Sequence, residues 1–299
     1  MKAAANISTL RGVATPSRAT DLYELTKPRM NFLVVITTMV GFCMASHDGI
    51  NWLLMLHTIL GTALTAASAA SLNQLIERRL DQLMPRTADR PVASGRIKSV
   101  EALLCGIAFG VVGVAWLALA VNLLTALLGL ATLVLYIAIY TPLKRITSLN
   151  TVVGAIPGAI PPLMGFTAAQ NALSIEALAL FAILFFWQMP HFLAIAILYR
   201  RDYQLAGFRM LPCIEEDQRL TSLMIVLYSS ALLPVTLLPS LLGMAGAVYF
   251  TAAVLLGLAF ASYAVTCAMT RVRADARQLF FASIIYLPML LGFMMFDKL

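Results

Sequence analysis

The stretch that decides the fold is residues 101–140, which read EALLCGIAFGVVGVAWLALAVNLLTALLGLATLVLYIAIY. Its only charged residue is Glu101, at the first position, and Asn122 divides the rest into two apolar runs, 101–121 and 123–140. A transmembrane α-helix needs about 20 consecutive, mostly apolar residues to cross the hydrocarbon core of a bilayer. This stretch therefore predicts two membrane-spanning helices joined by a very short turn.

Apolar runs of the same kind continue on both sides of this pair. They lie at 30–46, 51–72, 151–168, 174–198, 221–241, 244–268 and 279–296. Of the 299 residues, 61% are hydrophobic and 12% are charged, whereas a soluble domain carries about 25% charged residues. We therefore predict an all-α, polytopic membrane protein with about nine transmembrane helices. Residues 21–299 form its single transmembrane domain, and residues 1–20 form a flexible cytoplasmic tail.

The basic residues predict the orientation of these helices. Twenty of the 21 Lys and Arg lie in the N-terminal segment and in the connections 73–100, 141–150, 199–220 and 269–278, which leaves Lys298 on the other side. Because cytoplasmic loops carry an excess of Lys and Arg, the N-terminus and these four loops are expected in the cytoplasm of a cell (inner) membrane protein. The net charge of +7 is thus assigned to topology in a lipid bilayer, and we predict no nucleic-acid partner.

The first candidate site lies at the end of the second span, where Asn73, Glu77 and Asp81 recur every four residues. On a helix this spacing keeps three oxygen-bearing side chains on one face. Such oxygens are ligands of hard cations, and Mg²⁺ commonly takes one or two carboxylates together with substrate phosphates. The surrounding cations are Arg78, Arg79, Arg86 and Arg90. They suit an anionic substrate, although the alternative is a juxtamembrane helix whose acids and bases pair with each other.

Two further segments at the same side of the membrane carry candidate residues. Lys144 and Arg145, which follow Tyr140 between spans four and five, are either topology markers or contacts to a diphosphate. His191 lies near the end of span six, eleven residues before Asp202. On a continuous helix the two would share a face, about three turns apart. A histidine inside a span suggests a functional site, and the alternative is a helix–helix hydrogen bond.

Together the three segments supply oxygen ligands and cations of the kind that a Mg²⁺-diphosphate needs, at three helix ends on one side of the membrane. The apolar spans beneath them could hold a long hydrocarbon tail. These requirements meet in one reaction class, prenyl transfer from an isoprenoid diphosphate inside the membrane.

These residues resemble the UbiA-type intramembrane prenyltransferases, because Asn73 through Asp81 looks like the first acidic motif of that family. The finer pattern is similar to the branch that farnesylates haem. It shows in Leu25-Thr26-Lys27-Pro28-Arg29, in 81–91, in Tyr140-Thr141-Pro142-Leu143-Lys144-Arg145 and in 187–212. The most specific part is Tyr199-x-x-Asp202-Tyr203-x-x-Ala206-Gly207-x-x-Met210-Leu211-Pro212, which stands where other branches carry a second motif rich in aspartates.

Three positions depart from the family pattern. Glu77 stands where Asp is usual, Arg79 where a further acid is common, and Gln74 where Asn or Asp is found. Glu77 keeps a carboxylate one methylene further from the backbone. Arg79 removes a ligand, so metal binding leans more on Asp81 and Asp202.

The resemblance implies a ring of nine helices around a central cavity, with farnesyl diphosphate and haem B as substrates. It implies Mg²⁺ held by Asn73, Glu77, Asp81 and Asp202, with Lys144 and Arg145 completing the catalytic set. The implied substrate-binding residues are Lys27, Arg29, Arg86, Arg90, Tyr140, His191 and Tyr199, of which His191 is the expected contact to haem iron. A contact with haem A synthase or with terminal oxidase assembly is a further expectation.

Two alternatives stay open at this level. A related prenyltransferase could act on a quinone precursor or another tetrapyrrole, which a second Asp-rich motif near Asp202 would favour; that motif is absent. A transporter would carry broken helices and charges near the midplane. Only the Gly and Pro content of the fifth span, 151–168, favours transport, and a kinked helix beside a cavity explains that content as well.

Overall fold

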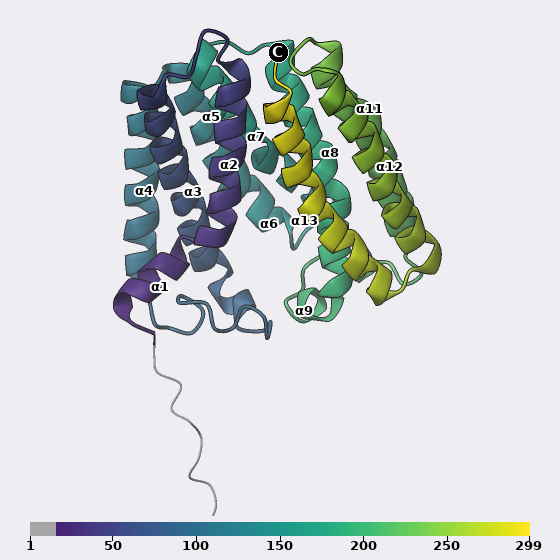
Figure 1. Cartoon of the computed structure of the whole chain (residues 1–299). Helices are drawn as coiled ribbons and strands as arrows, with labels where there is room; N and C mark the ends of the chain where they lie inside the picture. Colours follow the sequence, from purple (N-terminus) through teal and green to yellow (C-terminus); the bar gives the residue numbers. More distant parts are fainter. Residues whose placement is uncertain (1–15) are drawn as a thin grey trace, which may run out of the picture.

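The structure, a computed structural model, describes residues 16–299 (Figure 1). Within that range nine helices are long and apolar enough to cross a membrane. They are α2 (Pro28–Ala45), α3 (Trp52–Asp81), α4 (Ser99–Ala120), the continuous run of α5 (Leu123–Val134), a π-helical turn η1 (Leu135–Tyr140) and α6 (Thr141–Leu143), then α7 (Asn150–Gln170), α8 (Ile175–Leu198), α11 (Arg219–Leu241), α12 (Ala247–Thr270) and α13 (Arg273–Phe296). The predicted all-α fold with nine spans is confirmed.

Helix α3 is longer than its apolar run. That run ends at residue 72, and the helix continues to Asp81, as the placement of Asn73, Glu77 and Asp81 on one helix face assumed. Thirty residues at 1.5 Å each make a rod about 45 Å long, against a hydrocarbon core of about 30 Å. The last turns of α3 therefore extend beyond the apolar layer, and these turns carry the first candidate site.

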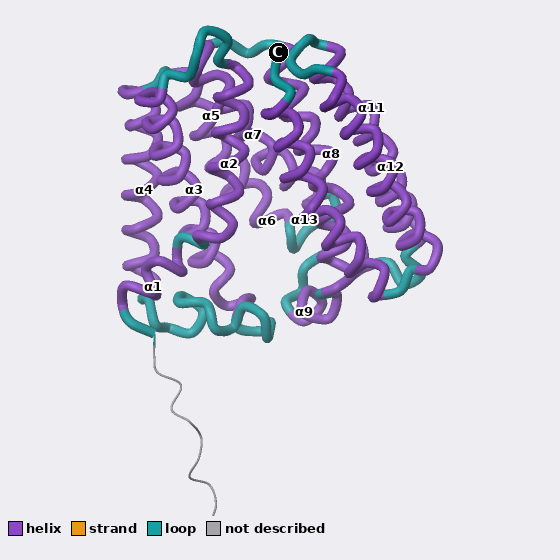
Figure 2. The backbone as a smooth tube through the Cα atoms, in the orientation of Figure 1, coloured by secondary structure: helices purple, strands orange, loops and turns teal. Residues whose placement is uncertain are grey.

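The helices form two groups that meet along α7 and α8. The first group contains α2, α3, α4, α5 and α7, and the second contains α8, α11, α12 and α13 (Figure 1). The contact of α13 with α2 closes the arrangement into a ring. Helices make up most of the described chain, and most of the loops lie at the two ends of the bundle (Figure 2).

Helix α7 is the most buried span, with 72% of its apolar window inside the protein. Its glycines let α2 approach to backbone contact. A Cβ at Gly165 would lie 1.8 Å from the Thr38 carbonyl oxygen, and one at Gly41 would lie 2.0 Å from the Pro162 carbonyl oxygen. Small residues of this kind are the usual means of close helix packing in membranes. The glycines at this contact therefore serve close packing of α7 against α2.

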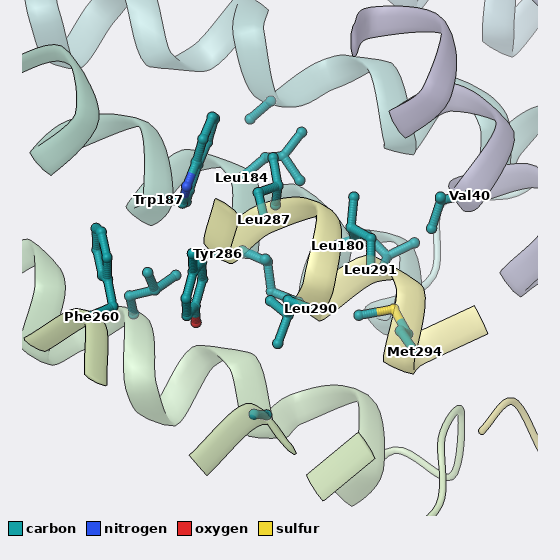
Figure 3. Packing of buried hydrophobic residues seen from close by; sticks show 14 of the residues in the cluster. Val40, Leu180, Leu184, Trp187, Phe260, Tyr286, Leu287, Leu290, Leu291 and Met294 are labelled. Atoms are coloured by element: carbon teal, nitrogen blue, oxygen red, sulfur yellow. The ribbon is translucent and has the colours of Figure 1, made fainter. Parts of the chain in front are cut away.

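The apolar side chains divide between an interior and an outer surface. Between α8, α12 and α13 the interior contains Trp187, Phe260, Tyr286 and Leu290 (Figure 3). Large apolar residues also cover the outside, and Leu119, for example, is 89% exposed. A soluble protein does not leave so much apolar surface in water. The outer surface thus suits contact with lipid tails.

The polar connections after α3, α8 and α12 lie at the end of the bundle opposite the C-terminus, together with the short helix α1 (Arg18–Leu25), and the connection after α6 faces the same end from further inside the bundle (Figure 1). The same end holds α9 (Arg200–Leu205) and α10 (Leu211–Ile214). Most of the expected tail at 1–20 lies outside the described residues, and Arg18–Thr20 already belong to α1.

Candidate active site

The site begins on the last turns of α3, where three polar side chains are buried. Asn73 is 1% exposed, Glu77 4% and Asp81 1%. They share one helix face because they recur at intervals of four residues. Burial of two carboxylates is costly unless each has a partner, so their surroundings decide what the site can do.

Each carboxylate is paired with a cation from a different loop. Glu77 Oε1 lies 2.7 Å from Lys144 Nζ, and Arg90 Nη1 donates to both oxygens of Asp81, at 2.8 and 2.9 Å. Although burial disfavours the ammonium ion, the neighbouring Tyr140 and the Glu77 carboxylate raise the pKa of Lys144 above its usual value. The Lys144 ammonium also lies 4.6 Å from the centre of the Tyr140 ring, a cation–π contact.

A third cation reaches Asn73 from the start of α2. Lys27 has a left-handed backbone conformation (φ 48°) between α1 and α2, and its Nζ donates to Asn73 Oδ1 at 2.6 Å. Burial, reinforced by the charge of Arg90, lowers the pKa of Lys27 to about 7. Two cations and Lys27, which is about half protonated at neutral pH, thus face two carboxylates, so the site can accept a further anion.

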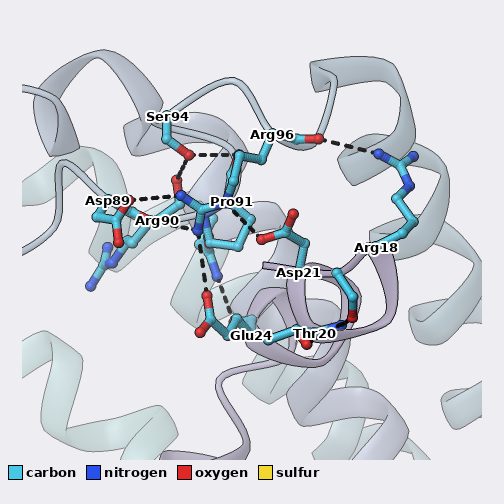
Figure 4. Close-up of polar contacts among 11 residues, drawn as sticks. Arg18, Thr20, Asp21, Glu24, Asp89, Arg90, Pro91, Ser94 and Arg96 are labelled. Carbon is cyan, nitrogen blue, oxygen red and sulfur yellow. Dashed lines mark hydrogen bonds and ion pairs between the residues drawn. The ribbon is translucent and has the colours of Figure 1, made fainter. Parts of the chain in front are cut away.

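Helix α1 is fastened to the loop after α3, and this fastening places Lys27. Arg96 pairs with Asp21 at 2.7 Å, Asp89 at 2.7 Å and Glu24 at 3.5 Å (Figure 4). Gln74, next to Asn73 on α3, donates to the carbonyl oxygens of Glu24 and Leu25 at the end of α1. The chain is therefore held just before Lys27.

The loop that follows α8 packs against the other two segments. The Arg209 backbone N–H donates to the Lys144 carbonyl at 2.7 Å, and Phe208 lies 5.7 Å from the Lys144 ammonium. Arg86 stacks over the rings of Tyr199 and Tyr203, at 4.5 and 5.7 Å from their centres. The three segments singled out from the sequence are thus neighbours in space.

Three predicted residues do not join this cluster. Asp202 is half-buried on α9, and Arg145 and Arg29 are exposed; within residues 16–299 none of the three forms a side-chain hydrogen bond or ion pair. Over the same range no three acidic, histidine or cysteine side chains come together as a metal site. The structure therefore places Asp202 apart from Glu77 and Asp81, and its role as a metal ligand stays a prediction.

His191 and Asp202 do not share one continuous helix, so that interpretation was wrong. Helix α8 ends at Leu198, and the backbone of Tyr199 (φ −111°, ψ 27°) turns the chain before α9 begins. His191 itself lies on α8, with Nδ1 2.7 Å from Ser283 Oγ on α13.

The sequence interpretation missed several supporting residues. Thr141 accepts a long hydrogen bond, 3.4 Å, from Asn73 Nδ2, and Asn150 donates to the Arg209 carbonyl at 3.1 Å. Of the residues that support the site, only Gln74 could have been noticed in the sequence, because it departs from the family pattern. In the structure its side chain donates to the end of α1. Arg79, the other departure, is exposed and forms no hydrogen bond among the described residues.

Comparison with known proteins now decides the family. A sequence profile described as the UbiA prenyltransferase family matches residues 34–285. The chain belongs to the UbiA prenyltransferase family. Relatives named protoheme IX farnesyltransferase are similar over nearly the whole chain: one from Solibacter usitatus is 46% identical, covering 93% of this chain and 98% of the relative, and one from Myxococcus xanthus is 45% identical, covering 96% and 98%.

Solved structures of UbiA proteins share the fold. A digeranylgeranylglyceryl phosphate synthase has a TM-score of 0.77 at 15% identity, covering 93% of this chain and 98% of that chain. A UbiA homolog from Archaeoglobus fulgidus bound to GPP and Mg²⁺ has a TM-score of 0.67 at 18% identity, covering 92% and 99%. This UbiA-family chain is a multi-pass membrane prenyltransferase.

The oxygen set on α3 fits the Mg²⁺ that the UbiA family implies. One amide and two carboxylates on a buried helix face are hard ligands of the type that Mg²⁺ selects. Lys144 contacts one oxygen of Glu77 and Arg90 contacts both oxygens of Asp81, so a metal would either share these carboxylates with the two cations or turn the cations toward another anion. A diphosphate would be that anion.

Proposed function

We propose that this protein transfers a farnesyl group from farnesyl diphosphate to a vinyl group of haem B, giving haem O and pyrophosphate. The observation that carries the proposal is the buried cluster of Glu77, Asp81, Lys144 and Arg90 at the membrane boundary. A prenyl diphosphate has a charged head and an apolar tail, and it matches a charged cluster set above apolar spans. The acceptor is assigned through the relatives that are 45% and 46% identical.

In the proposed site, Asn73, Glu77 and Asp81 hold Mg²⁺, with Asp202 joining from α9. When bound, the metal neutralises charge on the diphosphate. Lys144, Arg90 and Lys27 leave their present partners and donate to phosphate oxygens. Arg86, with Arg145 and Arg29 at the rim, supports the same anion. These fixed donors stabilise the charge that develops on the leaving group.

The reaction then breaks the bond between C1 of the farnesyl group and the bridging phosphate oxygen, and pyrophosphate leaves with the electron pair. The haem vinyl group supplies the electrons of the new carbon–carbon bond. Water adds as hydroxide to the remaining vinyl carbon, and its proton is released, which gives a hydroxyethylfarnesyl group. Tyr140 and Phe208 line the cluster at the Lys144 ammonium, so the chain surrounds the leaving group with aromatic rings as well as cations. Tyr199, stacked on Arg86, closes the side toward α9.

The direct test is a product assay. Membranes that contain the protein are supplied with haem B, farnesyl diphosphate and Mg²⁺, and the extracted haems are identified by mass spectrometry. A haem heavier by one farnesyl group and one hydroxyl group (C15H26O) supports the proposal. Matched reactions with geranyl or geranylgeranyl diphosphate report chain length, and a 4-hydroxybenzoate acceptor tests the related aromatic prenyl transfer. Prenylation of the aromatic acid without haem product would overturn the assignment.

The proposal also places the site at the cytoplasmic face of a cell inner membrane. Eighteen of the 19 Lys and Arg among residues 16–299 lie toward the end of the bundle that holds the site, and an excess of Lys and Arg is expected on the cytoplasmic side. Reporter fusions after residues 95, 147 and 215 should report cytoplasm, and fusions after 48, 122 and 171 the opposite side. An inverted pair would overturn the orientation. Delivery of the product to haem A synthase or to terminal oxidase assembly belongs to the same proposal.

A further inference from the structure

His191 occupies a narrow aromatic slot between α8 and α13. The Trp187 ring lies on one side, with centroids 4.9 Å apart and planes 20° from parallel, and the Phe280 ring stacks at 5.3 Å and 27°. Stacked rings leave the edge of the imidazole, with its two nitrogens, for contact with other groups. The functional question is which of the two nitrogens carries the proton.

The hydrogen bonds around Ser283 answer this question. Ser283 Oγ donates to the Phe280 carbonyl oxygen at 2.6 Å. A hydroxyl has one proton, so while that bond forms, the same oxygen accepts toward His191. In this arrangement Nδ1 of His191, 2.7 Å from Ser283 Oγ, carries a hydrogen. A neutral imidazole has one N–H, which leaves Nε2 with a lone pair, and Nε2 has no hydrogen-bond partner in the part of the chain that the structure describes.

The position of Ser283 is itself held. Trp187 Nε1 donates to the Ser283 carbonyl oxygen at 2.9 Å, and Ser283 is fully buried. Helix α8 thus contacts both the backbone and the hydroxyl of one residue on α13. A hydrogen bond that served only to join the two helices would be satisfied by either tautomer of His191. While Ser283 donates to Phe280, only the tautomer with the hydrogen on Nδ1 satisfies the contact between His191 and Ser283.

We propose that Ser283 is a positioning residue that keeps His191 in its Nδ1–H tautomer and so presents Nε2 as a ligand for the iron of the haem acceptor. Histidines that bind metals usually donate their other N–H to an oxygen, which fixes the ring and raises its basicity. The inference rests on the proposed function for the identity of the acceptor. The tautomer itself does not depend on that function, so it can be measured without haem.

The first experiment reads the tautomer by NMR. The chain has three histidines, so the double variant His47→Gln/His57→Gln, labelled with ¹⁵N-histidine, leaves His191 as its single imidazole. We expect a protonated Nδ1 and an unprotonated Nε2 in this parent. In Ser283→Ala the Nδ1–H population should fall because its acceptor is gone, and in Ser283→Thr, which keeps the hydroxyl, it should return. A parent with the proton on Nε2 would overturn the inference.

The second experiment titrates ferric haem B into purified protein and follows the Soret band. Ser283→Ala should shift the band and weaken binding by about 10- to 100-fold, the range for loss of a group that orients a metal ligand. Tyr249→Phe is the matched control, because it also removes a buried helix–helix hydrogen bond, from Tyr249 Oη to the Thr236 carbonyl at 2.7 Å. It should lower thermal stability comparably and leave the Soret band unchanged.

The outcomes separate the two claims. Normal haem binding in Ser283→Ala, with haem product still formed by the parent, would overturn the inference and leave the proposed function intact. A parent that binds no haem and makes no prenylated haem would overturn both the function and the ligand role of His191. Equal effects of Ser283→Ala and Tyr249→Phe on the Soret band would return Ser283 to a role in helix packing.

Discussion

The three carboxylates proposed to hold Mg²⁺ lie in two contrasting surroundings. Glu77 and Asp81 are almost fully buried on a rigid transmembrane helix, and each is paired with a cation. Asp202 is half-buried on α9, a helix of six residues, and has no ion pair among residues 16–299. The α3 side of the site is thus arranged in advance, whereas the proposal requires Asp202 on α9 to come closer in the substrate complex.

The same contrast separates the cations. Lys144, with 12% of its side chain exposed, is bound to Glu77 and stacked on Tyr140, while its neighbour Arg145 is exposed without a partner in the described range. A buried charge meets a phosphate in a low dielectric and an exposed one meets it in water, where it is screened. Substitution of a buried, paired group should therefore lower activity more than substitution of an exposed one.

The largest effect is expected for Asp81→Asn, which replaces a proposed anionic metal ligand by a neutral amide and leaves Arg90 without its carboxylate. Loss of an interaction of several kcal/mol lowers turnover by more than about 100-fold, because 1.36 kcal/mol corresponds to a factor of ten. Turnover is measured in detergent or nanodiscs at saturating Mg²⁺, with the melting temperature as a control for folding. Near-normal turnover at limiting Mg²⁺ would contradict the role of Asp81. Glu77→Asp keeps the charge and should be tolerated.

The next largest effect is expected for Lys144, and it should distinguish Lys144 from its neighbour Arg145. Lys144→Gln should raise the KM for farnesyl diphosphate by about 10- to 100-fold, since hydrogen bonds to charged groups contribute about 1.5–3 kcal/mol. Arg145→Gln should change it less than about fivefold, as exposed ion pairs contribute about 1 kcal/mol or less. The comparison uses initial rates at fixed haem B. A selective loss of haem affinity instead would assign this loop to the haem propionates.

Asp202→Ala should have a smaller effect that depends on metal concentration. If Asp202 joins the metal only in the substrate complex, its loss raises the Mg²⁺ requirement by about tenfold, equivalent to 1.36 kcal/mol, and excess Mg²⁺ restores most of the rate. Turnover is followed across a Mg²⁺ titration, with the exposed neighbour Arg201→Ala as the control. An effect as severe and as irreversible as that of Asp81→Asn would remove the distinction between the two sides.

The smallest effect on catalysis is expected for Arg96→Ala, which frees α1. The change leaves the buried Asp21 without its cation, so the protein should lose about 1–3 kcal/mol of stability. Lys27 should then be positioned less well, and farnesyl diphosphate should bind a few-fold more weakly. Limited proteolysis near residues 18–25 and the KM report the two effects. Arg79→Ala, at an exposed site, should change neither.

The nine spans could be predicted from the sequence because each depends on a local property, a run of apolar residues long enough to cross the bilayer. The spacing of Asn73, Glu77 and Asp81 was informative for the same reason, since one helix carries all three. The cations that pair with Glu77 and Asp81 could not be predicted from such local patterns. Lys144 lies 67 residues from Glu77, and only the folded arrangement shows which loop cation meets which carboxylate.

The error at Tyr199 has a similar origin. Counting residues from His191 to Asp202 assumed one unbroken helix, and no Gly or Pro lies between them to signal otherwise. The break at Tyr199 coincides with tertiary contacts, among them the stacking of Arg86 on its ring. The tautomer of His191 could likewise not be predicted from the sequence, because its partner Ser283 lies 92 residues away.

Lys298, the one basic residue on the far side, gives the protein an order of assembly. Its ammonium group donates to the carbonyl oxygens of Cys43 and Ser46 at the end of α2, and thereby ties the ninth span to the first. Lys298 follows all nine spans in the chain, so this tie can form only after the last span has left the ribosome and entered the bilayer. Gln170 of α7, which donates to the Ala45 carbonyl at 2.9 Å, can hold the same end of α2 earlier, so the contact from Lys298 is the later of the two polar ties there.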